Sequence, residues 1–131
     1  MQPPNPIPGS AEHWLQRARG KLARARAPLP PGGFLEDLCF DAQQAAELAI
    51  KAVYQQQGWM FAYVHDLQHL LDGLRQNGLP IPQAVQEAFR LTDYATVTRY
   101  PGPYAPVTQA EYEEAVRIAD AVIAWASALI P

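Results

Sequence analysis

The residues best suited to chemistry in this chain are an arginine and two tyrosines in the segment TRYPGPY at 98–104: Arg99, Tyr100 and Tyr104. An arginine guanidinium can hold a phosphate or a carboxylate through two parallel hydrogen bonds. The tyrosines offer stacking faces, and the prolines stiffen the loop so that binding costs less ordering. The segment predicts a nucleotide or phosphate site, with Lys51 as a weaker phosphate candidate. The alternative is that Arg99 pairs with a neighbouring carboxylate while the tyrosines seal one end of the fold.

Histidines and a lone cysteine offer the other opportunities for site chemistry. His65 and His69 are four residues apart, so they share a helix face as zinc ligands do in HExxH motifs. The glutamate of that motif is absent, and a catalytic zinc site needs a third protein ligand, so we predict no metal and no cofactor. Instead, His65 or Asp66 is expected to cap a helix start. Cys39 is the only cysteine, which excludes an intramolecular disulfide and a multi-cysteine metal site.

A run of cations lies near the start of the chain. Its five members fall within ten residues: Arg17, Arg19, Lys21, Arg24 and Arg26. Such a locally positive stretch suits the docking of an acidic protein or a nucleotide. Arginine and lysine stems also cover apolar surface on ordinary amphipathic helices, which is the alternative. The formal net charge of the whole chain is −3, which argues against a general nucleic-acid binder, so RNA binding is not favoured.

The bulk composition indicates one globular domain. The chain has 131 residues, of which 49% are hydrophobic and 18% charged. Residues 1–10 hold four prolines and no periodic pattern, which predicts an extended arm, and residues 11–131 are predicted to form a single bundle domain. The start of the chain lacks the features of a signal peptide, and no long uncharged apolar run is present. The expected location is therefore the cytoplasm, without a membrane partner.

Helical periodicity covers most of the chain. The predicted helices are 11–27, 34–57, 65–76, 82–98 and a last one that opens at Thr108. Ser10 is the predicted N-cap of the first helix, and Gly58 is the predicted stop of the second. Thr108 and Glu111 have the spacing of a capping box. Because no strand pattern is apparent and the connections are short, the sequence predicts an all-α, up-and-down antiparallel bundle of about five helices.

The predicted helix 34–57 carries two stripes of side chains. One is rich in alanine and includes Cys39, and we expect it to form the bundle core. The other has heptad-like spacings of four, three, four and three: Phe40, Gln44, Glu47, Lys51 and Tyr54. A polar seam with an aromatic residue at each end suits a symmetric dimer, so we predict that this stripe is a homodimer interface. The alternatives are coverage by other helices of the same chain, or exposure to solvent.

Three segments, in this order, resemble a bacterial HEPN domain (higher eukaryotes and prokaryotes nucleotide-binding). They are CFDAQQAAELAIKAVYQQQG from residue 39, HDLQHLLDGL from residue 65 and TRYPGPYAPVT from residue 98. The resemblance covers nearly the whole chain from Trp14 onward. It implies a helical bundle that dimerises, in a cytoplasmic prokaryotic protein often encoded beside a minimal nucleotidyltransferase. Such pairs commonly act as toxin–antitoxin modules.

One departure from the family pattern bears on catalysis. The ribonuclease branch of the family carries an arginine followed four to six residues later by a histidine. No arginine lies at that distance before His13, His65 or His69. The cation that holds the phosphate and the imidazole that moves the proton are therefore not paired in the usual way. The resemblance thus implies a dimeric, non-catalytic nucleotide-binding and interaction module paired with a nucleotidyltransferase. The alternatives are a divergent ribonuclease toxin and a purely structural dimer with no ligand of its own.

Overall fold

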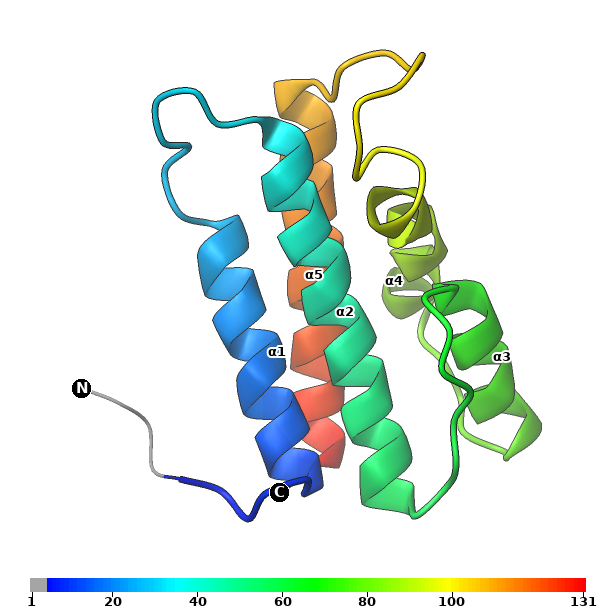
Figure 1. Ribbon diagram of the computed structural model, residues 1–131. Coiled ribbons are helices and arrows are strands. Elements are labelled where there is room, and N and C mark those ends of the chain that lie inside the picture. Colours follow the sequence, from blue (N-terminus) through cyan, green and yellow to red (C-terminus); the bar gives the residue numbers. More distant parts are fainter. Residues whose placement is uncertain (1–4) are drawn as a thin grey trace.

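The computed structural model describes residues 5–131, and every regular element in that range is helical (Figure 1). The elements are α1 (Ala11–Ala25), α2 (Leu35–Gln57), α3 (Leu67–Gln76), α4 (Gln83–Gln86), a 3₁₀ helix η1 (Glu87–Ala95) and α5 (Gln109–Leu129). The long helices α1, α2 and α5 lie side by side, α3 and η1 pack against the other flank of α2, and α4 packs against α5 and η1. The predicted all-α bundle is confirmed. Residues 1–4 of the predicted N-terminal arm lie outside the described residues.

The helix ends follow from local hydrogen bonding. The Ser10 hydroxyl accepts a hydrogen bond from the His13 amide, and it begins α1 as predicted. At the start of α5, the capping box is complete, with Glu111 Oε1 accepting from the Thr108 amide at 2.9 Å. Gly58 ends α2 with a φ of 74°, a left-handed conformation that glycine adopts without strain.

Three predicted boundaries were wrong. The helix predicted over 82–98 is α-helical only over Gln83–Gln86 and continues as the 3₁₀ helix η1 to Ala95. A 3₁₀ helix has three residues per turn, so this winding keeps Ala88, Leu91 and the partly buried Tyr94 on a single face. The first helix ends at Ala25 rather than at residue 27. The third begins at Leu67 rather than at residue 65, and its N-cap is Asp66, one of the two capping residues that the sequence predicts.

The core is built around α2, which packs against α1, α5 and η1. Its buried arc is rich in small side chains, which let neighbouring helices approach closely: Ala42, Ala45, Ala46, Ala49 and Ala52. Cys39 is fully buried in this arc, as predicted. Burial, followed by the charges of Glu36 and Glu111, raises the pKa of its thiol to about 12. The cysteine is therefore a small core residue rather than a nucleophile.

None of the helices in residues 5–131 combines the length and apolar character required to cross a lipid bilayer.

The contact between α2 and α3 depends on a glycine. The Tyr54 hydroxyl of α2 donates a hydrogen bond of 2.6 Å to the carbonyl oxygen of Leu70 in α3. A Cβ atom at Gly73 would overlap that hydroxyl, whereas a Cβ atom at Gly20 in α1 would meet no atom within 4 Å. The packing of the fold therefore requires the absence of a side chain at Gly73 but not at Gly20.

Alanine substitutions at these glycines should act in opposite directions. We expect Gly73→Ala to lower the free energy of unfolding by about 1–3 kcal/mol, because Tyr54 must shift and lose its hydrogen bond. Gly20→Ala should raise it by about 0.5–1 kcal/mol, because alanine favours the helix and nothing obstructs its methyl group. Urea unfolding of both variants provides the comparison. Equal changes in the free energy of unfolding at the two positions would show that helix propensity alone accounts for both substitutions, and would contradict the role of the Tyr54 contact.

Candidate functional site

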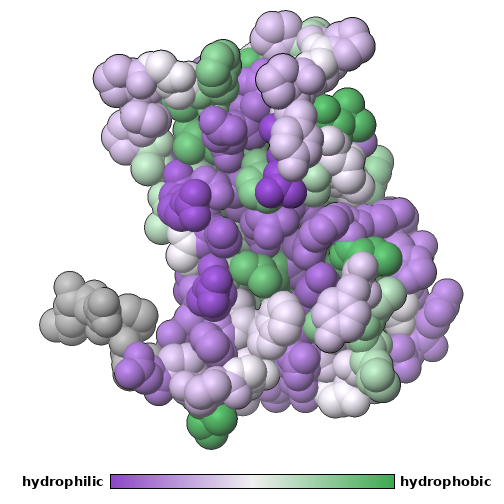
Figure 2. Space-filling model, viewed as in Figure 1, coloured by the Kyte–Doolittle hydropathy of each residue, from purple (hydrophilic) through white to green (hydrophobic). Residues whose placement is uncertain are grey.

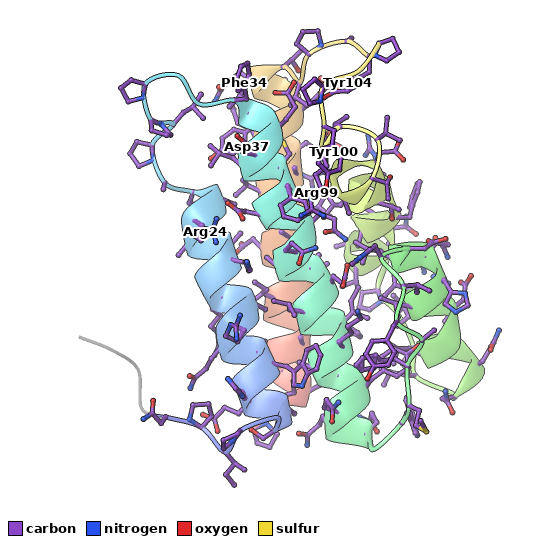
Figure 3. All side chains as sticks on the ribbon, in the orientation of Figure 1. Arg24, Phe34, Asp37, Arg99, Tyr100 and Tyr104 are labelled. Atoms are coloured by element: carbon purple, nitrogen blue, oxygen red, sulfur yellow. The ribbon has the colours of Figure 1, made fainter. Side chains whose placement is uncertain are left out.

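Arg99 lies on the loop after η1 and reaches α2 (Figure 3). Its guanidinium carbon is 4.5 Å from the ring centroid of Phe40 and 5.6 Å from that of Tyr100. These distances are typical of cation–π contacts. Arg99 forms no ion pair with any residue in the described range, so its hydrogen-bond donors are not taken up by a carboxylate.

Tyr104 holds the loop in shape. Its hydroxyl donates to the carbonyl oxygens of Thr98, at 3.1 Å, and Tyr100, at 2.7 Å, so the loop folds back on itself. Tyr104 is half-buried, whereas Tyr100 is 65% exposed. Of the two predicted stacking residues, Tyr100 therefore presents the accessible ring and Tyr104 positions the loop.

A hollow of 340 Å³ opens beside Arg99, and we call it the Arg99 hollow. Its aromatic walls include Phe34, which is 66% exposed, and Tyr100. Glu36 and Asp37, from the first turn of α2, also line it, and Glu36 accepts a hydrogen bond of 3.5 Å from the Val107 amide. The hollow therefore combines aromatic faces, one cation and two carboxylates, which suits a ligand with a ring, an anionic group and hydrogen-bond donors.

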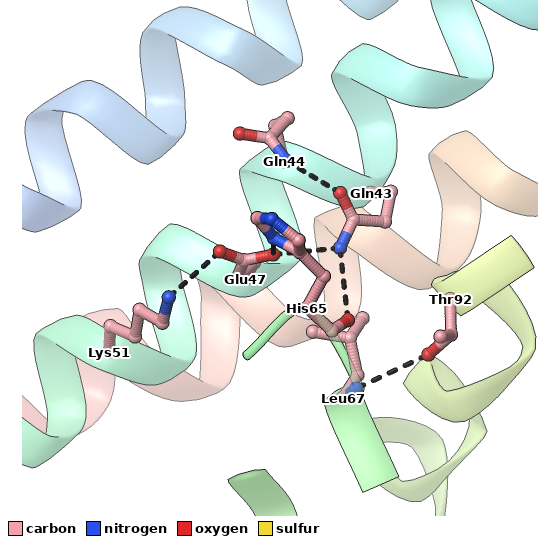
Figure 4. A network of polar contacts seen from close by, with 7 residues as sticks. All are labelled: Gln43, Gln44, Glu47, Lys51, His65, Leu67 and Thr92. Carbon is pink, nitrogen blue, oxygen red and sulfur yellow. Dashed lines mark hydrogen bonds and ion pairs between the residues drawn. The ribbon is translucent and has the colours of Figure 1, made fainter. Parts of the chain in front are cut away.

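A second polar group, the Glu47 cluster, lies further along α2 (Figure 4). Glu47 Oε2 is 2.9 Å from Lys51 Nζ. Its other oxygen, Oε1, accepts hydrogen bonds from Gln43 Nε2 at 3.0 Å and from His65 Nδ1 at 2.9 Å. Glu47, Lys51 and Gln43 are all buried, and His65 comes from the segment between α2 and α3. The cluster thus fastens that segment to α2 with charge-assisted hydrogen bonds.

The charge state of this cluster follows from its contacts. Burial by itself raises the pKa of the Glu47 carboxyl, but hydrogen bonds from Lys51, Gln43 and His65 and the Lys51 charge outweigh it and lower the pKa. Glu47 is therefore ionised and can only accept, so His65 donates from Nδ1. When the imidazole is neutral, Nε2 is an acceptor, on a side chain that is 59% exposed.

The structure divides the predicted interface stripe into two parts. Lys51 Nζ lies 5.2 Å from the Phe61 ring centroid, and the Tyr54 ring lies 5.7 Å from it. Glu47, Lys51 and Tyr54 are thus covered by the chain's own connection between α2 and α3, whereas Phe40 and Gln44 are only half-buried.

Lys51 and Arg99 do not belong to one site. Lys51 follows Phe40, the residue that Arg99 contacts, by eleven positions on one helix, or about 16 Å at 1.5 Å per residue. Lys51 is also held by Glu47. The sequence analysis missed Gln43 and His65 as members of the Glu47 cluster. The available signal was a glutamine on the apolar arc of α2, four residues before Glu47, which needed a polar partner.

The other predicted candidates are placed as follows. His65 points into the Glu47 cluster, while His69 is exposed and its amide bonds to the Asp66 carboxylate. Over the described part of the chain, no three histidine, cysteine or acidic side chains are grouped as a metal site would require. In the basic run, Arg24 is 3.6 Å from Asp41, Arg26 is 2.9 Å from Asp120, and Arg19 donates to the Ser127 hydroxyl.

Comparison with known proteins gives two matches. The family model of the HEPN domain matches residues 11–129. The crystal structure of an archaeal HEPN homologue is similar to this chain, with a TM-score of 0.74 and 30% sequence identity. That similarity covers 93% of this chain and 98% of the archaeal one. No curated protein matches this chain in sequence. The two matches take in almost the whole bundle.

The Glu47–Lys51 pair should make a pH-dependent contribution to stability. At pH 7 we expect Lys51→Met to lower the free energy of unfolding by about 3 kcal/mol, because it leaves a buried carboxylate without its counter-charge. In the wild type, the lowered pKa of Glu47 stabilises the fold above about pH 4.3, the unfolded value, and this contribution is lost as the pH falls through the folded pKa. The difference in free energy of unfolding between Lys51→Met and the wild type should therefore become smaller as the pH falls.

Urea unfolding from pH 7 to pH 3.5 measures this difference. Arg75→Met is the matched control, because Arg75 forms a more exposed ion pair with Asp72. This substitution should lower the free energy of unfolding by less than about 1 kcal/mol. A Lys51→Met penalty that stays constant with pH would contradict the assignment to the Glu47 charge.

Proposed function

The chain belongs to the HEPN family, and we propose that it is a homodimeric, non-catalytic nucleotide-binding and interaction module that pairs with a minimal nucleotidyltransferase. The family resemblance in the sequence motifs is the basis for the partner and for a toxin–antitoxin role. The absence of an arginine four to six residues before any histidine supports the non-catalytic part of the proposal.

The observation that carries nucleotide binding is the unpaired Arg99 at the edge of an aromatic hollow. We propose that the nucleobase stacks on Tyr100 or Phe34 and that a phosphate binds the Arg99 guanidinium. Asp37 adds negative charge to the same hollow, so its carboxylate suits the amino and hydroxyl donors of base and ribose rather than the phosphates.

Removal of Arg99 should weaken nucleotide binding selectively. We expect Arg99→Ala to reduce ATP affinity roughly 10- to 100-fold, the range for loss of a hydrogen-bonded charge contact. Isothermal titration calorimetry with AMP, ADP and ATP measures this effect and the number of phosphates preferred. Arg117→Ala is the control, because Arg117 faces Glu87 and does not line the hollow. If the wild type gives neither heat nor a thermal shift with any of the three nucleotides, the nucleotide proposal fails.

The proposed homodimer depends on the part of the α2 stripe that remains accessible, Phe40 and Gln44. Aromatic residues are enriched in interface cores and polar residues at their rims, so Phe40, whose ring contacts Arg99, and Gln44 suit the edge of a contact between two copies. The remaining three residues of the stripe are buried under the chain's own connection between α2 and α3, so the proposed contact does not use them directly.

A charge placed on this surface should dissociate the dimer. We expect wild-type protein at micromolar concentration to have the mass of two chains in multi-angle light scattering, and Gln44→Lys to raise the dissociation constant at least about tenfold, because the new charge is desolvated at the contact. Gln55→Lys, on an exposed position near the end of the same helix, should leave the mass unchanged. A monomeric wild type would refute the dimer.

A further inference from the structure

Three aromatic side chains and one leucine lie beside the Glu47 cluster, and we call them the aromatic patch: Trp14, Phe61, Tyr63 and Leu48. The Trp14 and Phe61 rings meet edge to face, with centroids 5.5 Å apart, and the Phe61 and Tyr63 centroids are 5.8 Å apart. Tyr63 is 93% exposed and Met60, on the same segment, is 95% exposed. The surface bearing α1, α2 and this segment faces the viewer in Figure 2. Exposed large side chains next to a packed aromatic group indicate a binding surface rather than an isolated apolar residue.

The patch borders a hollow between α1 and α2. This hollow has a volume of 280 Å³ and is lined by Gly9, His13, Trp14, Arg17 and Leu48. Trp14 and Leu48 belong both to the patch and to the hollow wall. A large aliphatic or aromatic side chain from a ligand could therefore enter the hollow while the rest of the ligand lies over Phe61 and Tyr63.

Arg17 gives the hollow its charge. Its side chain is exposed and forms no ion pair or hydrogen bond within residues 5–131, unlike Arg24 and Arg26, which face carboxylates of the chain itself. Among the described residues, no acidic side chain lines the hollow, and Glu47, which precedes Leu48 on α2, already receives hydrogen bonds from its own cluster. The charge on the wall of the hollow is therefore that of Arg17, and a complementary ligand carries a carboxylate.

We propose that the aromatic patch and Arg17 dock an acidic, amphipathic segment of a partner protein. One apolar anchor of that segment occupies the hollow beside Trp14 and Leu48, and a carboxylate next to the anchor pairs with Arg17. Tryptophan, tyrosine and arginine are enriched at the centre of protein interfaces, and this surface contains one of each: Trp14, Tyr63 and Arg17. The proposal assigns a docking surface to the partner protein of the proposed function and rests on that function for the existence of such a partner.

The test is a selection from a displayed library of random 16-residue peptides on the wild-type protein. We expect the selected peptides to share at least one aspartate or glutamate near a large apolar residue. Fluorescence anisotropy of a selected peptide should show affinity at least tenfold weaker for Arg17→Glu and for Tyr63→Ser. Arg19→Glu is the matched control: it makes the same charge change in α1, but Arg19 contacts Ser127 of α5, so affinity should be unchanged. Circular dichroism verifies that each variant is folded.

Several outcomes would overturn the proposal. They are the selection of no peptide, a consensus without acidic residues, and equal binding to wild type and Arg17→Glu. Light scattering that shows a dimer dissociated by Tyr63→Ser would assign the patch to a second copy of the chain. Sedimentation with anionic phosphatidylserine vesicles that is lost in Arg17→Glu would assign it to a membrane surface.

The same protein samples separate this proposal from the nucleotide-binding function. ATP titration of wild type and Arg17→Glu reports on the Arg99 hollow, which does not contain Arg17. Normal ATP binding without peptide selection refutes the docking surface alone. Peptide binding with the expected variant effects, but without ATP binding, refutes the nucleotide function alone.

Discussion

The arrangement of this bundle depends most on the contacts of one buried carboxylate, that of Glu47. It joins Lys51 and Gln43 of α2 to His65, and so ties the irregular segment after Gly58 to the central helix. Because the segment is held there, Phe61 covers Tyr54 and Lys51, and α3 begins where the Tyr54 hydroxyl can reach Leu70. A buried charge is costly unless each of its hydrogen-bonding positions is satisfied, and no described buried side-chain polar atom lacks a partner.

Local signals were sufficient to predict much of the fold. Ser10, Gly58 and the Thr108–Glu111 box ended or began helices as predicted, because capping depends on residues only a few positions apart. The 3₁₀ winding of η1 could not be predicted this way. Its apolar residues Ala88, Leu91 and Tyr94 recur at a spacing of three, and over so short a stretch both an α-helix and a 3₁₀ helix bring residues at this spacing to one face, so the pattern does not distinguish the two.

The candidate site was harder to predict than the fold. The spacing from Phe40 to Tyr54 correctly indicated a second face of α2 that needs a cover, and the structure supplies one for Glu47, Lys51 and Tyr54 from the same chain. That cover is an irregular segment whose path over α2 has no periodic signal in the sequence. Likewise, the sequence grouped Lys51 with Arg99 by residue type, whereas Lys51 lies eleven positions along α2 from Phe40, the residue that Arg99 contacts.

Between Leu35 and Gln57, α2 contains neither glycine nor proline, and its backbone is one uninterrupted helix. Such a helix has no hinge, so it holds Glu36 and Asp37 of the Arg99 hollow at a constant distance from Leu48 of the aromatic patch. Consider a protein that binds both the Arg99 hollow and the aromatic patch. Its second contact benefits from a high effective concentration only when the distance between its own two contacts matches the distance between these two sites. The rigidity of a single helix would then select partners by length, independently of the strength of either contact alone.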